Sequence, residues 1–358
     1  MDIFQAQNPA AWDAFLASQA FRPFLQSWTM GEVYRDTGQE PIRVEVREGT
    51  DIVATCQAIL VDARRGKHLS IPYGPVMRNQ ESGMRNQVLE TLLNELIRIG
   101  RQHRCSFIRM SPFWPKLPTP YALRPLPHAV PSPLHLLAEH VWYLPLVTPD
   151  PWQSGDRSPA KQAVSEEALF SAMRKTTRNL IRRAEKEGVE IVASPDPVKD
   201  VEAFIALHEE TRKRHHFTPY TNAFFRSQVT RFAPRGECSV YLARYQGEIA
   251  AASIHMHVGG ETSYHHGASA SKFAKIPASY LLQWTAIRDA LRRGDHVYNF
   301  WGIAPEGVRQ HPFAGVTLFK TGFGGTLLEL QHCIDLPLSK RYYLTRAFEL
   351  LRKWRRGF

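Results

Sequence analysis

Cysteine is scarce in this sequence, and its spacing excludes several classes of protein. The 358 residues include four cysteines, Cys56, Cys105, Cys238 and Cys333, and no two of them form a Cys-x-x-Cys pair. A disulfide framework and a cysteine zinc site are therefore not expected. Four buried thiols in a reducing cytoplasm fit this usage, and we predict no metal site.

Long apolar runs are also missing. No run reaches the roughly 18 residues that a membrane-spanning helix needs, and residues 1–15 lack the basic start and apolar core of a signal peptide. P-loop, Gly-x-Gly-x-x-Gly and Gly-x-Ser-x-Gly motifs are absent as well. We therefore expect a cytoplasmic protein without the nucleotide-binding loops or nucleophile elbow that those motifs build.

Positive charge, in contrast, is in excess. The chain has 45 lysines and arginines against 34 acidic residues, a formal net charge of +11. Such a balance attracts polyanions, among them nucleic acids, nucleotide phosphates and anionic membranes. A solvated basic surface without a partner explains the composition equally well, so the placement of the charges has to decide.

Length and patterning indicate two domains, and the second half of the chain repeats the first loosely. A 358-residue chain that is 43% hydrophobic can fill two cores. Each copy reads as a hairpin turning at a glycine (Gly49 or Gly247), a third strand, an amphipathic helix and a short strand. In the first copy we expect the hairpin at 43–61, the third strand at 68–77, the helix at 88–97 and the short strand at 105–110. In the second copy the same elements are expected at 240–258, 262–269, 277–293 and 296–303.

We therefore predict two tandem α/β units with mixed sheets, although a chance alignment of generic patterns is the alternative. The boundaries are expected at 1–145 and 146–337, with a helix at 338–358 packing back on the first domain. A proline-rich crossing at 111–159 is expected to contain one short strand, 140–147. A helix should begin after Ser165, with Glu166 and Glu167 in its first turn.

A basic stripe is the first candidate site. Arg174, Arg178, Arg182 and Lys186 are spaced by four, so they lie on one helical face. Like charges repel one another along a helix, which favours contact with phosphates. A solvated basic face is the alternative. Lys272 and Lys275, just before a helix start at Pro277, could add an anion site.

Phe319 and Lys320 form a second candidate, in a β-like run that ends in a glycine turn. A lysine there could direct its ammonium at a developing oxyanion. His255 and His257 alternate on an expected strand, where core or substrate-facing histidines are more plausible than metal ligands.

Five segments in order resemble the FemABX aminoacyltransferases, from Leu25 to about Leu338. They read FLQSWTMGEVYRDTG, KTTRNLIRRAEKEGVEI, YHHGASASKFAKIPASYLLQWTAI, YNFWGI and HPFAGVTLFKTGFGGTLLELQHCIDLPLS. The resemblance implies two tandem GNAT-like domains, in the form without a coiled-coil arm. It also implies transfer of an amino acid from aminoacyl-tRNA to the stem peptide of UDP-MurNAc-pentapeptide or lipid II, with no further cofactor. The missing glycine-rich pyrophosphate loop argues against CoA as the donor.

The resemblance also implies residue roles, with both substrates held in one cleft between two lobes. Lys320 would stabilise the oxyanion, and His266 could accept the amine proton. Two departures stand out: Ser111 replaces an acidic residue found in some members, and Tyr220 stands where an arginine is expected, so Arg214 could serve instead. The expected substrate-binding residues are Trp28, Tyr34, Arg35, Tyr73, Arg109, Arg214, Tyr220, Tyr264, Ser269 and Phe319. The expected tRNA-binding residues are Arg174, Lys175, Arg178, Arg182, Lys272 and Lys275.

Alternatives stay open at this point. Another acyl transferase of the same double fold could act on a protein N-terminus or a small amine, and a non-catalytic RNA-binding protein would share the basic stripe. The C-terminal helix has Tyr343, Ala347, Phe348, Leu351 and Trp354 on one side, with Arg346, Arg352, Lys353, Arg355 and Arg356 outside. We expect that side to pack on the first domain, and contact with an anionic membrane as a peripheral anchor is the alternative.

Overall fold

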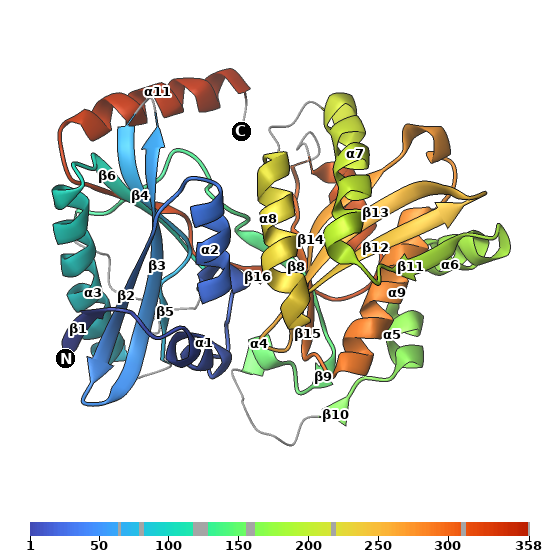
Figure 1. Ribbon diagram of the computed structural model, residues 1–358, viewed down its shortest axis with the longest axis horizontal. Helices are drawn as coiled ribbons and strands as arrows, with labels where there is room; N and C mark the ends of the chain where they lie inside the picture. The colour runs from blue at the N-terminus through green and yellow to red at the C-terminus, as the bar shows by residue number, and fades with distance from the viewer. Residues whose placement is uncertain are drawn as a thin grey trace. The chain divides into compact units, whose positions relative to one another are not determined.

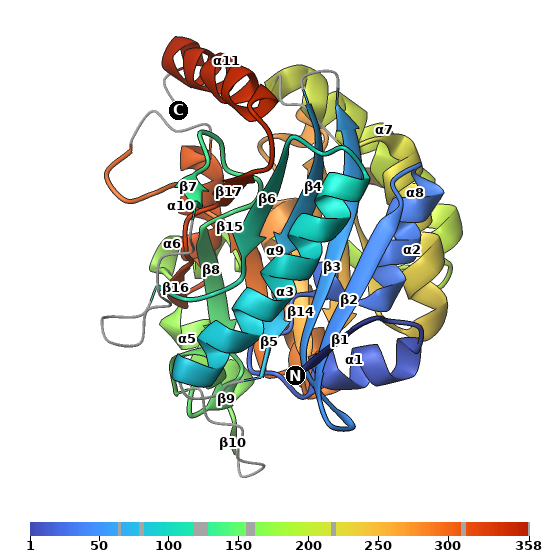
Figure 2. The same ribbon diagram turned by 90° about the vertical axis from the view of Figure 1, so that its left-hand side faces the viewer.

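The chain forms two units, each built around one mixed β-sheet. A computed structural model describes residues 1–63, 66–78, 82–116, 128–154, 162–215, 220–308 and 313–356. Unit 1 comprises Met1–Glu139 and Glu329–Phe358, and unit 2 comprises His140–Leu328. Figures 1 and 2 show the helices packed on the sheets of the two units.

The sheet of unit 1 has the strand order β1-β2-β3-β4-β6-β17-β7, and β5 also pairs with β3. Helix α3 covers one face, with Leu92 and Leu96 fully buried against Val46 and Ile108. The strands are β1 Asp2–Gln5, β2 Pro41–Glu48, β3 Asp51–Ala63, β4 Gly66–Tyr73, β5 Val76–Met77, β6 Phe107–Pro112, β7 Val130–Pro131 and β17 Ile334–Pro337. The helices are α1 Pro9–Ala17, η1 Phe24–Gln26, α2 Trp28–Asp36, α3 Ser82–Gln102 and α11 Arg341–Arg356.

The sheet of unit 2 has the order β11-β12-β13-β14-β15-β8-β16, beside a small β9-β10 pair. Its core includes the predicted stripe of Leu282, Ala286 and Ala290 on α9. The strands are β8 His140–Pro145, β9 Val147–Thr148, β10 Gln162–Ala163, β11 Glu190–Ala193, β12 Cys238–Tyr245, β13 Glu248–Val258, β14 Glu261–Ser269, β15 Val297–Gly302 and β16 Thr326–Glu329. The helices are α4 Pro151–Ser154, α5 Glu166–Ala172, α6 Lys175–Lys186, α7 Pro197–His215, α8 Asn222–Phe232, η2 Ala233–Arg235, η3 Ser271–Phe273, α9 Ala278–Arg293 and α10 Ala314–Thr321.

The predicted repeat is confirmed as β2-β3-β4-α3-β6 in unit 1 and β12-β13-β14-α9-β15 in unit 2. In both units the first three strands are antiparallel, and the strands before and after the helix are parallel. Gly49 and Gly247 have positive φ angles of 60° and 80°, which a hairpin turn requires. The Ser165 hydroxyl accepts a hydrogen bond from Ala168 N and caps α5, as predicted.

Three features differ from the sequence predictions. Residues 140–145 form β8, which pairs with β15, so the first boundary lies between Glu139 and His140. The chain returns to unit 1 at Glu329, before the C-terminal helix, because β17 pairs with β6. Lys320 lies on helix α10 rather than in a strand, because tertiary contacts override the β-propensity of Val316 and Thr317.

The four cysteines are free and buried. Among the residues that the structure describes, no helix combines the length and the apolar character needed to cross a membrane.

Candidate functional site

A cavity of about 590 Å³ lies in unit 2, beside the part of β14 that extends beyond its pairing with β15. Strands β14 and β15 pair from Glu261 with Val297 to Ser263 with Asn299, and then each continues without the other. The walls are mostly small or apolar, with a few hydroxyl and amide groups, as is common in ligand sites. They comprise Thr211, Ala251, Ala252, Ser253, Tyr264, Gly267, Ala268, Ser269, Ser279, Leu282, Gln283, Phe313, Gly315, Val316 and Phe319.

Tyr264 owes its position in this cavity to Gly267. A Cβ atom at position 267 would lie 1.8 Å from the Tyr264 hydroxyl, so any other residue would displace the phenol. Burial raises the pKa of Tyr264 to about 12, which keeps the phenol protonated and able to donate a hydrogen bond. The predicted residues Tyr264, Ser269 and Phe319 all line the cavity.

Lys320 lies directly behind this wall. Its ammonium donates to Gly302 O at 2.6 Å and lies 5.9 Å from the centroid of the Tyr264 ring. The residue is 7% exposed, and burial lowers the pKa of Lys320 to about 7. Lys320 is thus a buried group that changes charge near neutral pH, a property that functional lysines share.

The basic motif at the start of α6 holds the helix that carries Lys320. The backbone N–H of Arg174 donates to Gly322 O at 2.9 Å, and its guanidinium bonds to Leu318 O and the Thr321 hydroxyl on α10. A Cβ at Gly322 would lie 2.4 Å from the Thr177 hydroxyl, so glycine permits this close approach. Part of the motif therefore serves packing between α6 and α10.

The six predicted tRNA-binding cations fall into two groups. Arg174, Arg178 and Lys272 have protein partners: Arg178 donates to Ser171 O and Met173 O, and Lys272 pairs with Glu248. Lys175, Arg182 and Lys275 are exposed, and the Arg182 guanidinium lies 5.2 Å from the centroid of the Phe170 ring. The Lys275 backbone carbonyl accepts a hydrogen bond from Arg183 of α6, so the basic helix also contacts the segment before α9. Exposed cations on α6 thus flank elements that line the cavity.

His266 is placed away from the cavity walls, among aromatic rings. Its ring lies 4.8 Å from that of Phe225 and 5.4 Å from that of Tyr220. Burial lowers the pKa of His266 well below its ordinary value, and Nε2 has no hydrogen-bond partner in the described part of the chain. Tyr220 stacks on Phe224 and is exposed. The side chain of Arg214 lies outside the described residues. The geometry lends His266 no support as a base.

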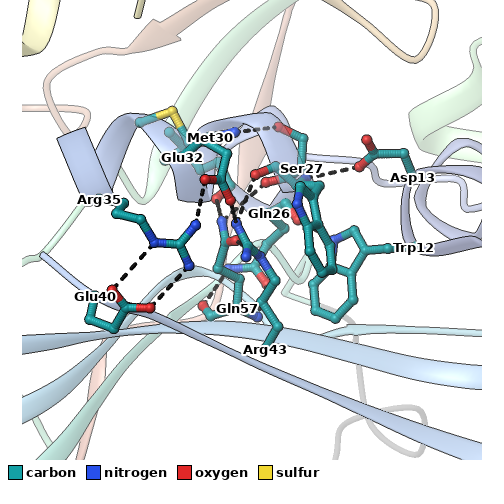
Figure 3. Close-up of polar contacts among 12 residues, drawn as sticks. Trp12, Asp13, Gln26, Ser27, Met30, Glu32, Arg35, Glu40, Arg43 and Gln57 are labelled. Carbon is teal, nitrogen blue, oxygen red and sulfur yellow. Dashed lines mark hydrogen bonds and ion pairs between the residues drawn. The ribbon is translucent and has the colours of Figure 1, made fainter. Parts of the chain in front are cut away.

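In unit 1, the QSWTMG segment forms a buried hydrogen-bonded cluster (Figure 3). The Gln26 amide donates to Gln57 O and Pro72 O and accepts from Gln57 N. The Ser27 hydroxyl accepts from Met30 N and caps α2. A Cβ at Gly31 would lie 2.1 Å from a guanidinium nitrogen of Arg43, which explains a glycine inside a helix. Gln26, Ser27 and Gly31 of this motif therefore have structural roles in the cluster.

The predicted substrate residues of α2 surround this cluster. The Arg43 guanidinium lies 3.9 Å above the Trp28 ring and pairs with Glu32 at 2.7 Å. Arg35 pairs with Glu32 and Glu40 (Figure 3), and the hydrogen bond to Glu40 raises the pKa of Arg35. Tyr34 is buried. Binding of substrate by Arg35 stays a prediction, and a substrate phosphate would compete there with the two carboxylates of Glu32 and Glu40.

Two further predicted residues of unit 1 have structural roles. Arg109 is buried and donates to both carboxylate oxygens of Asp335 and of Glu349. Burial opposes its charge, but these hydrogen bonds outweigh burial and raise the pKa of Arg109. The Tyr73 hydroxyl donates to Ala138 O at 2.8 Å. Because Arg109 uses its guanidinium in these bonds, the prediction that it binds substrate is corrected.

Several polar groups at the cavity were not singled out from the sequence. Gln283 and Ser253 line it, and Tyr298 donates to Gln283 Oε1 at 2.5 Å and bonds to His255 at 2.8 Å. Burial lowers the pKa of His255 to about 3, so this histidine is a neutral core residue. Two sequence signals could have indicated these groups. They are the strand alternation along residues 251–255 and the helical spacing between residues 279 and 283.

A cluster of three potential metal ligands lies in unit 1, although no metal site was predicted. His135, Glu139 and His332 place ligand atoms within 4.8 Å of one another. Glu139 is already paired with both rings, at 3.0 and 2.9 Å, and accepts a hydrogen bond from Cys333 N. Because those contacts satisfy the carboxylate, we interpret the cluster as an ion-paired network.

Comparisons with known proteins match both units. Residues 8–117 match the FemAB family, and residues 171–309 match the acetyltransferase (GNAT) domain. A stretch of 93 residues is 31% identical to aminoacyltransferase FemA of Staphylococcus aureus (strain MW2). That stretch covers 26% of this chain and 22% of FemA, so the match spans about a fifth of that relative.

Solved structures share the complete fold. The crystal structure of FemX matches with a TM-score of 0.79 and 16% identity, over 96% of this chain and 99% of that chain. A tandem GNAT protein from the clavulanic acid biosynthesis pathway matches with a TM-score of 0.53 and 13% identity, over 93% and 97%. Unit 1 is thus similar to the FemAB family, unit 2 is similar to the acetyltransferase (GNAT) domain, and the chain shares the fold of FemX and of a tandem GNAT protein.

Proposed function

We propose that this protein is an aminoacyltransferase that moves an amino acid from aminoacyl-tRNA to the stem peptide of a peptidoglycan precursor. The observation that supports this most strongly is the buried Lys320 ammonium behind the cavity of unit 2, on a helix bonded to the basic helix α6. The cavity would hold the aminoacyl group, and exposed cations such as Lys175 and Arg182 would contact tRNA phosphates.

The chemistry asks for little beyond positioning and charge stabilisation. The acceptor amine attacks the ester carbonyl, a tetrahedral intermediate forms, and the 3′-terminal ribose oxygen leaves with a proton. The ester is already activated, so neither ATP nor another cofactor is needed. Holding the two reactants in line can supply about 7–11 kcal/mol of the barrier. The Lys320 ammonium, and a donor such as the Tyr264 hydroxyl, would stabilise the oxyanion.

The acceptor would be UDP-MurNAc-pentapeptide or lipid II, and the enzyme would work in the cytoplasm. To test this, the protein is incubated with charged tRNA and each precursor, and the products are read by mass spectrometry. We expect the precursor to gain the mass of an aminoacyl residue. When ribonuclease is added before the reaction, we expect no gain in mass. Transfer that survives ribonuclease would contradict the proposal.

A second candidate is transfer of an acyl group to another amine, which the acetyltransferase (GNAT) match in unit 2 favours. It predicts a product with acetyl-CoA in the same assay without tRNA. Adding acetyl-CoA as a separate donor therefore distinguishes the two functions.

A further inference from the structure

Helix α11 is oriented with its polar face toward unit 1 and its apolar face toward solvent. Tyr342, Thr345, Arg346 and Glu349 are spaced as one helical face, and Tyr342 and Thr345 are buried against the unit. The opposite face is exposed: Leu344 by 75%, Leu351 by 53% and Trp354 by 80%, together with Tyr343, Phe348 and Leu350. Figure 1 shows α11 lying across the end of unit 1, beside the ends of β4 and β6.

A buried network fixes this orientation. Arg109 of β6 binds both oxygens of Glu349, at 3.0 and 2.7 Å, and also binds Asp335 of β17. The Tyr342 hydroxyl donates to Asp335 at 3.0 Å, and Arg346 donates to Pro131 O at 2.7 Å. Rotating the helix would break the pair of Arg109 with Glu349 and the hydrogen bond of Tyr342 to Asp335, and the loss of one partner of a buried ion pair is costly. The sequence-based expectation that the apolar side packs on the first domain is therefore wrong, although the helix does belong to unit 1.

Charge indicates what covers the exposed apolar face. Glu349 is the single acidic residue of α11 in the sequence, and Arg109 already neutralises it. Arg341, Lys353 and Arg355 are exposed on the same helix. A second copy of the chain would cover the apolar side chains but bring like charges together. An anionic bilayer accepts both, because apolar side chains and tryptophan enter its interface while cations contact its phosphates.

We propose that α11 docks this protein on an anionic lipid bilayer, with Leu344, Leu351 and Trp354 inserted into the interface. The docking goes beyond the proposed transfer reaction, because it needs neither tRNA nor acceptor. It would place unit 1 at the membrane surface through one helix that lies in the interface plane and does not cross it.

The test is co-sedimentation of the full chain with phosphatidylcholine vesicles, with and without phosphatidylglycerol. We expect binding that requires phosphatidylglycerol and weakens with added salt. The variant Leu351→Ser/Trp354→Ser should bind at least about tenfold more weakly, since it removes two inserted side chains. Lys353→Glu/Arg355→Glu should also weaken binding.

Matched controls come from the first turn of α7, where Val198 and Lys199 are exposed. Val198→Ser/Lys199→Glu should bind vesicles like the wild type, and equal melting temperatures would show that all variants are folded. The proposal is overturned if the wild type does not bind, binds phosphatidylcholine equally well, or keeps its affinity in Leu351→Ser/Trp354→Ser. Sedimentation velocity gives a further outcome: dimerisation that depends on Leu351 and Trp354, without vesicle binding, would assign this face to a second copy and also overturn the proposal.

Discussion

In unit 1 the parallel strands β4 and β6 stay paired from His68 with Phe107 to Tyr73 with Pro112, whereas in unit 2 the pairing of β14 and β15 ends at Ser263 with Asn299. At the end of β4, the Gln26 side chain bonds to Pro72 O. In the equivalent strand of unit 2, the part of β14 beyond this pairing instead contributes the cavity-lining residues Tyr264 and Gly267–Ser269. One repeated topology thus gives a closed, hydrogen-bonded cluster in one unit and a ligand-sized cavity in the other.

The buried cations differ in the same way. Arg43 in unit 1 has Glu32, Gln57 and the Trp28 carbonyl as partners. Within the described residues, the Lys320 ammonium of unit 2 donates to one backbone carbonyl, Gly302 O, and pairs with no carboxylate. A cation with a paired carboxylate stabilises a fold, while a desolvated cation with a neutral partner can still respond to a developing negative charge. This contrast is the reason that the proposed transfer reaction is placed in unit 2.

The largest expected effect is that of Lys320→Met. Removing a preorganised oxyanion donor typically costs about 100-fold to 1,000-fold in turnover, so we expect a loss of that size in single-turnover transfer from aminoacyl-tRNA. Acceptor binding should change little. Lys199→Met, an exposed lysine of α7, is the matched control. An unchanged single-turnover rate would remove Lys320 from the chemistry.

Substituting one glycine in each unit tests the contrast between the closed cluster of unit 1 and the cavity of unit 2. Gly31→Ala should destabilise the protein by about 1–3 kcal/mol, as overpacking of a fixed cluster does, because the new Cβ would meet Arg43 and Gln57 at 2.1 and 2.2 Å. Urea unfolding measures this free energy. In Gly267→Ala the Cβ would meet only the tip of the Tyr264 side chain, which can move, so transfer should fall more than stability does. An unchanged free energy of unfolding in Gly31→Ala would show that the cluster of unit 1 rearranges to accommodate the new Cβ.

Much of this fold could be predicted from the sequence, because hairpin glycines and apolar periodicity are local signals. Leu92 and Leu96, or Ala286 and Ala290, mark a helix face without reference to the rest of the chain. The roles of charged residues could not be predicted in the same way. Arg109 has partners more than two hundred positions away, at Asp335 and Glu349, so no local pattern reveals that it is paired.

The orientation of α11 shows the same limit. Its amphipathic pattern predicts a helix, but the pattern alone implies that the apolar face is buried. The ion-paired network of Arg109, Asp335 and Glu349 reverses this assignment. For Lys320, the sequence motif was enough to name the residue as a candidate. That it lies on a helix and is buried could be seen only in the structure.

The pH dependence of transfer should report on Lys320. Burial lowers the pKa of Lys320 to about 7, so the ammonium is lost as pH rises above that value. If the charged form stabilises the oxyanion, the single-turnover rate acquires a falling limb near pH 7 of up to about tenfold per pH unit. Lys320→Arg stays charged and should lack this limb. A rate that instead rises through pH 7, with the rise lost in Lys320→Arg, would identify the neutral amine as the base.

The smallest expected effects concern two histidines whose pKa shifts have opposite signs. The hydrogen bond to Glu139 raises the pKa of His332 in unit 1, so its contribution to stability is present below the unfolded value of about 6.5 and is lost as pH rises through the folded pKa. Burial lowers the pKa of His255 in unit 2 to about 3, so its contribution is present above about 6.5 and is lost as pH falls toward 3.

His332→Asn should therefore destabilise the protein more at pH 6 than at pH 8.5, by under about 1 kcal/mol because the ring is 36% exposed. Urea unfolding across this pH range measures the difference, and a larger cost at the higher pH would mean that the pair with Glu139 does not form in solution.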